Sequence, residues 1–387
     1  MTPDVTKTRD LGPAELHPVA RLPEEWQSVV AEMGERSFRA RQIFRWIHHR
    51  GVMNPAQMTD LPAPLRERLA EAGLAEPATV AHVHRAADGT RKLLLELSGG
   101  ARVECVIIPM TRRDDGAAPE DADAAAAVDD DEDDEPARQR ITLCISTQYG
   151  CAMGCVFCAS GQAGLVRGLG AAEIVAQVQI ARRYLEPHED LRNLVFMGMG
   201  EPLHHYDETA RAIRLISHAD GFGMGLRRIT VSTVGLVPGI ARLGEDFGGR
   251  IGLAVSLHAP DNATRDRIVP MNKSYPVERL IEALRRYPLP QRRRITIEYT
   301  LIAGQNDSVE HATKLARLLE GLRVKVNLIP MNSIEASQLD ASPDDNVEAF
   351  REELAQFGLS CFVRTRRGDD VSAACGQLAL RTGPTAP

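Results

Sequence analysis

The sequence lacks the long apolar segments that membrane and secreted proteins carry. None of its hydrophobic runs approaches the roughly 20 residues that cross a bilayer. The first residues, MTPDVTKTRDLGPAEL, mix charges with prolines and contain no apolar core of the kind found in signal peptides. We therefore expect a soluble, cytoplasmic protein without a membrane partner.

Aromatic residues and cysteines are also scarce. Aromatic side chains make up 4% of the chain, too few for a broad surface that stacks nucleic-acid bases. The seven cysteines are an odd number, and three of them fall between Cys151 and Cys158. This pattern disfavours a disulfide scaffold and favours metal or redox chemistry. The 387 residues are otherwise of globular composition and are enough for one large domain and a smaller one.

The net charge of −7 comes from one segment of the chain. Twelve acidic residues and no basic ones lie between Asp114 and Glu135, and without them the net charge would be +5. The remaining chain is therefore mildly basic, which permits a nucleic-acid partner. Because the acidic run has almost nothing apolar to bury, we expect residues 111–140 to be a disordered insertion, with an interaction tail as the alternative.

Hydrophobic periodicity predicts two small segments before this insertion. A flexible N-terminus, 1–22, precedes a helical segment, 23–76. Because this segment carries many arginines, which suit contact with phosphates, we expect it to be an RNA-binding accessory domain. Helices are expected at 24–33, 36–51 and 62–72, and the apolar face of the second would include Phe38, Ile43, Phe44 and Trp46. Residues 77–110 alternate in the manner of strands and form a β-rich connecting segment, with a hairpin turn at Asp88 and Gly89.

From residue 141 to 380, strands alternate strictly with helices, and a short tail, 381–387, follows. Six strand–helix units and a final strand indicate an α/β fold with a parallel sheet that curls into a partial or full barrel. Such barrels place their chemistry in the loops after the carboxyl ends of the strands. The unusual residues occur there: the cysteines, GMGEP, Ser232, Ser256 to His258, and Asn332.

Cys151, Cys155 and Cys158 form a C-x3-C-x2-C motif in a glycine-rich loop. Glycines let a chain wrap closely around an inorganic core. Three thiolates leave a structural zinc site one ligand short, whereas in a [4Fe–4S] cluster they leave one iron open to an external ligand. Zinc completed by a distant Cys or His, and three buried core cysteines, are the alternatives.

This motif after the first barrel strand resembles the hallmark of the radical S-adenosylmethionine (radical SAM) superfamily. Within this superfamily, the chain resembles the RlmN/Cfr family of RNA methyltransferases, and its RlmN branch most closely. Six further motifs carry this resemblance: FMGMGEP, TVSTVG, SLHAP, IVPMNK, VNLIPMN and RGDDVSAACGQL. The resemblance covers the chain from about residue 20 to Leu380, apart from the acidic insertion. It implies a radical SAM-type partial (βα)6 barrel with a small N-terminal helical domain and a β-hairpin segment.

The resemblance also implies two cofactors and the residues that contact them. By position, Cys151, Cys155 and Cys158 would hold a [4Fe–4S] cluster whose open iron binds S-adenosylmethionine. Contacts to S-adenosylmethionine are expected at Gly200, Glu201, Ser232, Ser256, Leu257, His258 and Asn332. A carboxylate accepts hydrogen bonds from an ammonium group, and Ser, His and Asn suit ribose, carboxylate and adenine edges. Taken singly, each residue would more often serve a turn, a strand end or packing.

Three residues match the catalytic positions of the family. Cys375 would be the S-methylcysteine intermediate that carries the new carbon to adenine. Cys144 would then release the methylated RNA by forming a transient disulfide with Cys375. Glu104 would accept the ring proton, although a strand glutamate can equally be a solvated edge residue. The reaction further implies an external electron donor such as flavodoxin, whereas Cys105 and Cys361 match no role.

The family acts on an adenosine in the peptidyl-transferase region of 23S rRNA and, in some members, on the adenosine 3′ of the tRNA anticodon. Resemblance to the RlmN branch implies methylation at C2. Basic residues that can contact phosphates are Arg36, Arg39, Arg41, Arg45, His48, His49, Arg50, Arg227, Arg228, Arg292 to Arg294, Arg364, Arg366 and Arg367. A solvated charged surface is the equal alternative for each group. We expect a monomer that recognises folded RNA by its backbone and shape, with one adenine flipped into the barrel mouth.

Three other interpretations stay open. A Cfr-type enzyme would methylate C8 of an adenine in 23S rRNA and confer antibiotic resistance, and the shared motifs do not separate it from a C2 enzyme. A radical SAM enzyme that acts on peptides or small molecules is disfavoured by Cys144 and Cys375. A zinc-bearing RNA-binding module would have no catalytic activity and would contain neither iron nor sulfide.

Overall fold

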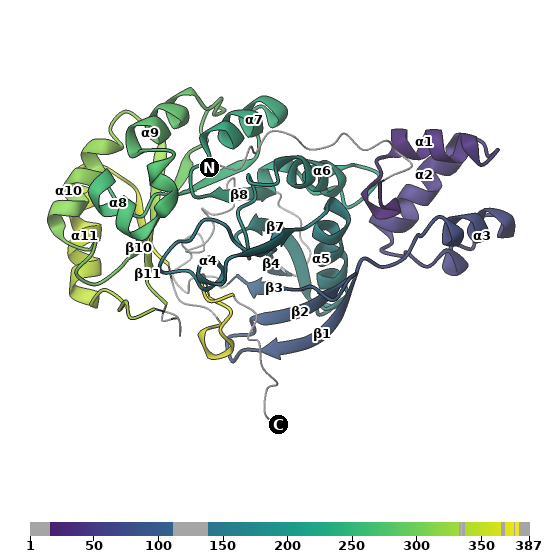
Figure 1. Cartoon of the computed structure of the whole chain (residues 1–387), viewed down its shortest axis with the longest axis horizontal. Coiled ribbons are helices and arrows are strands. Elements are labelled where there is room, and N and C mark those ends of the chain that lie inside the picture. Colours follow the sequence, from purple (N-terminus) through teal and green to yellow (C-terminus); the bar gives the residue numbers. More distant parts are fainter. Residues whose placement is uncertain are drawn as a thin grey trace.

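The structure, a computed structural model, describes residues 16–110, 138–332, 334, 337–364, 368–374 and 376–378. A ten-stranded sheet runs through the molecule in the order β1-β2-β3-β4-β7-β8-β9-β10-β11-β12 (Figure 1). Its strands are β1 (Ala78–Arg85), β2 (Arg91–Leu97), β3 (Arg102–Pro109), β4 (Gln139–Cys144), β7 (Glu189–Phe196), β8 (Ile229–Thr233), β9 (Gly252–Ser256), β10 (Ile295–Leu301), β11 (Val324–Pro330) and β12 (Cys361–Val363). A separate antiparallel pair, β5 (Gln148–Gly150) and β6 (Leu165–Gly168), flanks the cysteine motif.

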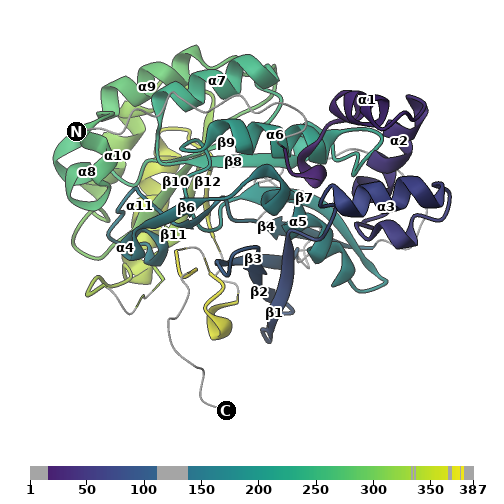
Figure 2. The same cartoon turned by 45° about the vertical axis from the view of Figure 1, so that its right-hand side comes forward.

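All neighbouring strands from β4 to β12 are parallel, as the alternation of strands and helices predicts. The connecting helices cover the outer side of the curved sheet (Figure 2). They are α5 (Ala171–Arg183), α6 (Tyr206–Ser217), α7 (Val237–Phe247), α8 (Asn262–Ile268), α9 (Val277–Arg286), α10 (Val309–Leu318) and α11 (Asp344–Gln356). Within the described residues β1 and β12 are the two ends of the sheet, so the barrel is partial.

The strands that precede the acidic segment extend this same sheet. β1, β2 and β3 form an antiparallel meander, and β3 pairs antiparallel with β4, with Val106 opposite Cys144. The turn between β1 and β2 contains Asp88 and Gly89, as predicted, and Gly89 has a φ of 83°. The β-rich segment is therefore continuous with the barrel, a pairing that the local sequence pattern does not predict.

The N-terminal segment is helical, with α1 (Pro23–Glu32), α2 (Phe38–Phe44), a π-helical turn η2 (Arg45–His49) and α3 (Ala63–Glu71). Ile43, Phe44 and Trp46 are buried as predicted. The expectation for Phe38 is wrong, because its side chain is 50% exposed. It is the first residue of its helix, and the Arg39 guanidinium lies over its ring, 4.7 Å from the centroid.

The remaining elements are short. They are α4 (Ala159–Ala163) and the 3-10 turns η1 (Pro18–Ala20), η3 (Pro55–Gln57), η4 (Leu226–Arg228), η5 (Pro270–Lys273) and η6 (Asp369–Val371). No helix in the described ranges is both long enough and apolar enough to span a membrane. The acidic run from Asp114 to Glu135 lies outside the described residues.

Candidate functional site

A cavity lies at the carboxyl ends of the parallel strands, with about 920 Å³ of empty space that is partly open to solvent. Its lining includes nine of the residues expected at the site: Cys151, Cys155, Cys158, Gly200, Glu201, Ser232, Ser256, His258 and Asn332. These residues come from five different strand ends, and the parallel arrangement brings those ends to one face. Leu257 is buried and is not among the lining residues described; its N–H donates to the Glu298 carbonyl at 3.1 Å.

The cysteine motif begins at a tight backbone crossing. Gly150 has a φ of 78°, and a Cβ at this position would lie 1.8 Å from the Gly164 carbonyl oxygen. The next residue, Cys151, donates its N–H to that same carbonyl at 3.0 Å. Only glycine permits this approach, because any side chain would collide with backbone that cannot move independently. The crossing closes the loop, so that its three cysteines border the cavity.

The three cysteines suit a metal cluster in their chemistry. Burial raises the pKa of Cys151 to about 12 and raises the pKa of Cys155 well above its ordinary value, so both are thiols until a cation compensates the thiolate charge. No three His, Cys, Asp or Glu side chains in the described part of the chain form a site for a single ion. Three cysteines that border one cavity supply the kind of ligands that hold iron–sulfur clusters.

Glu201 follows β7 and is buried beside the cysteines. Its carboxylate accepts the backbone N–H of Leu203 at 3.1 Å and of Val234 at 2.8 Å. Burial raises the pKa of Glu201 to about 7, against the opposing effect of these hydrogen bonds. A buried carboxylate on a cavity wall, held by two loops, can receive the ammonium group of an amino-acid ligand.

His258 follows β9 and takes a backbone conformation that is rare outside glycine, with a φ of 58°. Its Nδ1 accepts the Thr300 N–H at 3.0 Å, which leaves the proton of the neutral ring on Nε2. Burial, and then the charge of Arg265, lowers the pKa of His258 to about 3. The Phe157 ring packs edge-on against it with centroids 4.6 Å apart. His258 therefore offers the cavity a fixed neutral imidazole.

Sequence reasoning missed Arg265, whose side chain is fully buried beneath the site. It donates to the carbonyls of Leu257 and Val234, at 2.9 and 2.6 Å, and to Asn272 Oδ1 at 3.0 Å. Its positive charge lowers the pKa of Cys155 against the stronger effect of burial. Arg265 thus joins the loops after β8 and β9 under the cysteine motif. An arginine in a polar helix carries no sequence signal for such burial.

Cys144 and Glu104 lie beside the barrel mouth on neighbouring strands. Cys144 ends β4 opposite Val106 of β3, and Glu104 is two residues before Val106, so both side chains lie on one face of the sheet. Both are buried. The alternative that Glu104 is a solvated edge residue is wrong, because its Oε1 lies 3.0 Å from Lys92 Nζ.

Cys375 lies outside the described residues, but its neighbours contact the cysteine loop. Gly376 lines the cavity, and its carbonyl accepts the Ala159 N–H at 2.8 Å. The Ser160 hydroxyl donates to the Leu378 carbonyl. The segment that follows Cys375 therefore lies at the cavity that the three motif cysteines border.

The basic residues expected to face RNA are only partly available. The expectation for His48 is wrong: it is fully buried, and its ring centroid lies 4.4 Å from that of Phe44. Arg41 forms an exposed ion pair with Asp220 at 2.6 Å. Arg36, Arg45, His49 and Arg50 are exposed on the N-terminal segment, and Arg364 lines the cavity. Arg366 and Arg367 lie outside the described residues.

Two protein-family models match parts of this chain. The radical SAM superfamily matches residues 145–316, which contain the cysteine motif and most of the parallel strands. The ribosomal RNA large subunit methyltransferase N-terminal domain matches residues 23–74, which form the helical segment.

Relatives are similar over nearly the whole chain. A dual-specificity RNA methyltransferase RlmN of Sorangium cellulosum is 62% identical and covers 94% of this chain and 96% of its own. The RlmN of Anaeromyxobacter dehalogenans is 44% identical over 95% of this chain and 92% of its own. The crystal structure of a radical SAM methyltransferase from Sphaerobacter thermophilus is 41% identical, covers 93% of this chain and 98% of its own, and superposes with a TM-score of 0.82.

Proposed function

The chain belongs to the RlmN family of radical SAM RNA methyltransferases, and from this membership we propose that it methylates C2 of an adenosine in the peptidyl-transferase region of 23S rRNA and C2 of the adenosine 3′ of the tRNA anticodon. One observation carries the proposal. The three motif cysteines, Glu201 and His258 border one cavity, and the segment around Cys375 reaches the same cavity through Gly376.

The residues present fit the two cofactors of the family. Cys151, Cys155 and Cys158 would hold the [4Fe–4S] cluster, and the lining from Gly200 to Asn332 would hold S-adenosylmethionine. When bound, these groups supply the one-electron chemistry by which an unreactive aromatic carbon can be methylated. Glu201 would pair with the ammonium group of S-adenosylmethionine, and the Nε2–H of His258 would donate to a polar edge of the molecule.

Three residues of the chain carry out the remaining steps of the proposed reaction. Cys375 carries the new carbon to the adenine ring as a thioether, and Glu104 accepts the proton that the ring carbon loses. Cys144 attacks the sulfur of Cys375, so a disulfide bond forms and the bond between sulfur and the methylene carbon breaks. That carbon keeps the electron pair and takes up a proton, which gives the methyl group. A thiol reductant returns the two cysteines to their starting state.

The partners follow from this chemistry. An external donor such as flavodoxin would supply electrons to the cluster, and the enzyme would act as a monomer in the cytoplasm. Exposed arginines on the N-terminal segment would contact the phosphates of folded RNA, because the planar guanidinium suits phosphate recognition. Because only 4% of the residues are aromatic, the protein is better suited to extrude one adenine from the folded RNA than to stack many bases on its surface.

The test is nucleoside mass spectrometry of 23S rRNA and tRNA from cells with and without this protein. We expect 2-methyladenosine in both RNAs only when the wild-type chain is present, and in neither RNA with Cys375→Ala. Formation of 8-methyladenosine would overturn the proposed C2 specificity. Methylated rRNA without methylated tRNA would restrict the substrate to the ribosome.

A further inference from the structure

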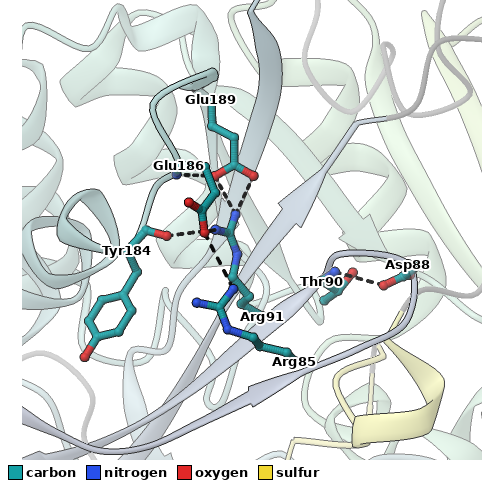
Figure 3. Close-up of polar contacts among 7 residues, drawn as sticks. All are labelled: Arg85, Asp88, Thr90, Arg91, Tyr184, Glu186 and Glu189. Carbon is teal, nitrogen blue, oxygen red and sulfur yellow. Dashed lines mark hydrogen bonds and ion pairs between the residues drawn. The ribbon is translucent and has the colours of Figure 1, made fainter.

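The turn between β1 and β2 holds the chain segment that leads to Cys375. The Gly368 N–H donates to Asp88 Oδ2 at 3.0 Å, and the Ala87 N–H donates to Asp370 Oδ2 at 3.0 Å. Figure 3 shows Asp88 at this turn beside the ribbon of the C-terminal segment. These contacts join residues 280 or more positions apart in the chain. Residues 368–374, which we call the C-terminal loop, are thus fastened to a hairpin outside the parallel strands.

Backbone geometry in the C-terminal loop depends on the same contact. Gly368 has a φ of 62°, and a Cβ there would lie 3.0 Å from Thr90 Cγ2 and 2.8 Å from Ala373 Cβ. Ser372 has a φ of 51°, a conformation that costs free energy for any residue with a Cβ. A strained backbone persists only where neighbouring contacts determine it. The hairpin supplies those contacts.

Lys92 of β2 supplies the most deeply placed contact. Its side chain is buried, its Nζ lies 3.0 Å from Glu104 Oε1, and it donates to the Ser372 carbonyl at 3.2 Å. Lys92 lies opposite Val106, and Val106 lies opposite Cys144, so the ammonium group shares a sheet face with Glu104 and Cys144. A buried ammonium is costly unless it is paired and hydrogen-bonded. Both of its acceptors here belong to the catalytic segments.

The preceding residue shows what a purely structural ion pair looks like on this hairpin. Arg91 lies on the opposite face, where its Nη2 is 2.6 Å from both oxygens of Glu189 and its Nη1 donates to the Tyr184 carbonyl at 2.8 Å (Figure 3). Glu189 begins β7, so this pair fixes the hairpin to the barrel. Arg91 therefore anchors the hairpin to the barrel, whereas Lys92 lies on the face of the sheet that carries Glu104 and Cys144.

We propose that Lys92 is a positioning residue for methyl transfer. Its ammonium group holds the Glu104 carboxylate and the C-terminal loop in one assembly, so that the proton acceptor and the cysteine that carries the carbon keep a fixed relationship. The inference rests on the proposed function, because it takes Glu104 and Cys375 in the roles given above. Lys92 contacts neither cofactor nor substrate in this scheme, and it acts through the two groups that it holds.

The test compares Lys92→Met, which removes the charge, with Lys92→Arg, which keeps it. Lys314→Met, at an exposed ion pair on α10, is the control. Each full-length protein would be reconstituted anaerobically and compared with the wild type in melting temperature and iron content. The first readout is hydrogen–deuterium exchange of the peptide 368–378, which needs no turnover. We expect exchange about fivefold faster in Lys92→Met, an intermediate rate in Lys92→Arg and no change in the control.

The second readout follows the reaction itself. In Lys92→Met we expect kcat for 2-methyladenosine to fall by about tenfold or more while KM for RNA is unchanged, because positioning acts after RNA has bound. The fraction of chains covalently attached to RNA should rise, since the adduct still forms but loses its proton slowly. Lys92→Arg should recover part of kcat. A role confined to stability would lower the melting temperature without trapping this adduct.

Several results would overturn the proposal. The first is an exchange rate and a kcat in Lys92→Met that equal those of the wild type. The second is a kcat in Lys92→Arg that is no higher than the kcat of Lys92→Met. If Lys92→Met does not fold, Lys92→Gln replaces it with the same expected losses, and wild-type values in that variant would overturn the proposal as well. A wild-type protein that forms no 2-methyladenosine would refute the proposed function instead, and the exchange measurement would still decide whether Lys92 anchors the loop.

Discussion

The Glu201 carboxylate accepts the backbone N–H of Val234 at 2.8 Å and thereby ties the loop after β7 to the loop after β8. Its other oxygen accepts the N–H of Leu203. The residue that we propose pairs with the cofactor ammonium is thus also a structural support of the cavity wall. Loss of its charge should affect both roles.

Glu201→Gln should lower stability and weaken cofactor binding together. One end of the amide is a donor, so it would oppose either the Leu203 or the Val234 N–H, at a cost of about 1–3 kcal/mol. We expect a lower melting temperature and an affinity for S-adenosylmethionine reduced at least about tenfold. Calorimetry and equilibrium dialysis measure the two effects. Glu245→Gln, at an exposed site on α7, is the control. An unchanged affinity of Glu201→Gln for S-adenosylmethionine would contradict the proposed contact between Glu201 and the ammonium group.

Cys155→Ala should abolish cluster binding. The remaining two cysteines of the motif leave two irons of a cubane cluster without a protein ligand. Iron and sulfide analysis after anaerobic reconstitution should give near-zero content, and methylation should be lost. Cys361→Ala, on β12 and not among the described lining residues, should keep full content. A complete, active cluster in Cys155→Ala would show that the ligand assignment is wrong.

Cys144→Ala should purify with RNA covalently attached through Cys375. In the proposed reaction Cys144 acts only in release, so its loss should leave adduct formation intact and block the disulfide step. A denaturing gel with nuclease digestion and peptide mass spectrometry detects the adduct. High salt removes ordinary phosphate contacts but not a covalent bond. The Cys144→Ala, Cys375→Ala double variant should carry no RNA, and an RNA-free Cys144→Ala beside active wild type would rule out the resolving role.

Arg265→Met should destabilise the barrel mouth by about 3–5 kcal/mol, because it leaves the carbonyls of Leu257 and Val234 buried without their donor. Arg265→Lys should restore only part of the lost stability, since one ammonium group cannot reach acceptors on both loops and on Asn272. Thermal unfolding measures the loss. Arg317→Met, on α10, is the control. Equal melting temperatures for Arg265→Met and wild type would show that other contacts hold these loops.

His48 should make the protein sensitive to acid. Burial lowers its pKa from 6.5 to about 3, so below pH 6.5 the unfolded chain binds a proton that the folded chain refuses. Its contribution to stability is complete above pH 6.5 and falls as the pH drops, by roughly 2 kcal/mol at pH 5. The difference in Tm between pH 7 and pH 5 should be smaller in His48→Phe. It should be unchanged in His49→Phe, at the exposed neighbouring position.

Much of the architecture could be predicted because it is written in local periodicity. Strand and helix patterns recur in strict alternation after residue 141, and parallel strands must end at one face, so the sequence predicts that GMGEP, Ser232, His258 and the cysteines converge. The observed cavity brings their side chains together. The sequence also predicts the hairpin turn at Asp88 and Gly89, because that dipeptide favours a tight reversal of the chain.

Tertiary structure decided what long-range contacts alone can decide. The sequence by itself determined the α/β class, the cysteine loop and the order of the strand-end residues, since each follows from spacing along the chain. Lys92 and Arg265 look like ordinary surface cations in the sequence, as His48 does among its basic neighbours. Only the folded chain buries them, because burial depends on which distant carbonyls, carboxylates and rings arrive at the same place. Neither helical nor strand periodicity carries that information.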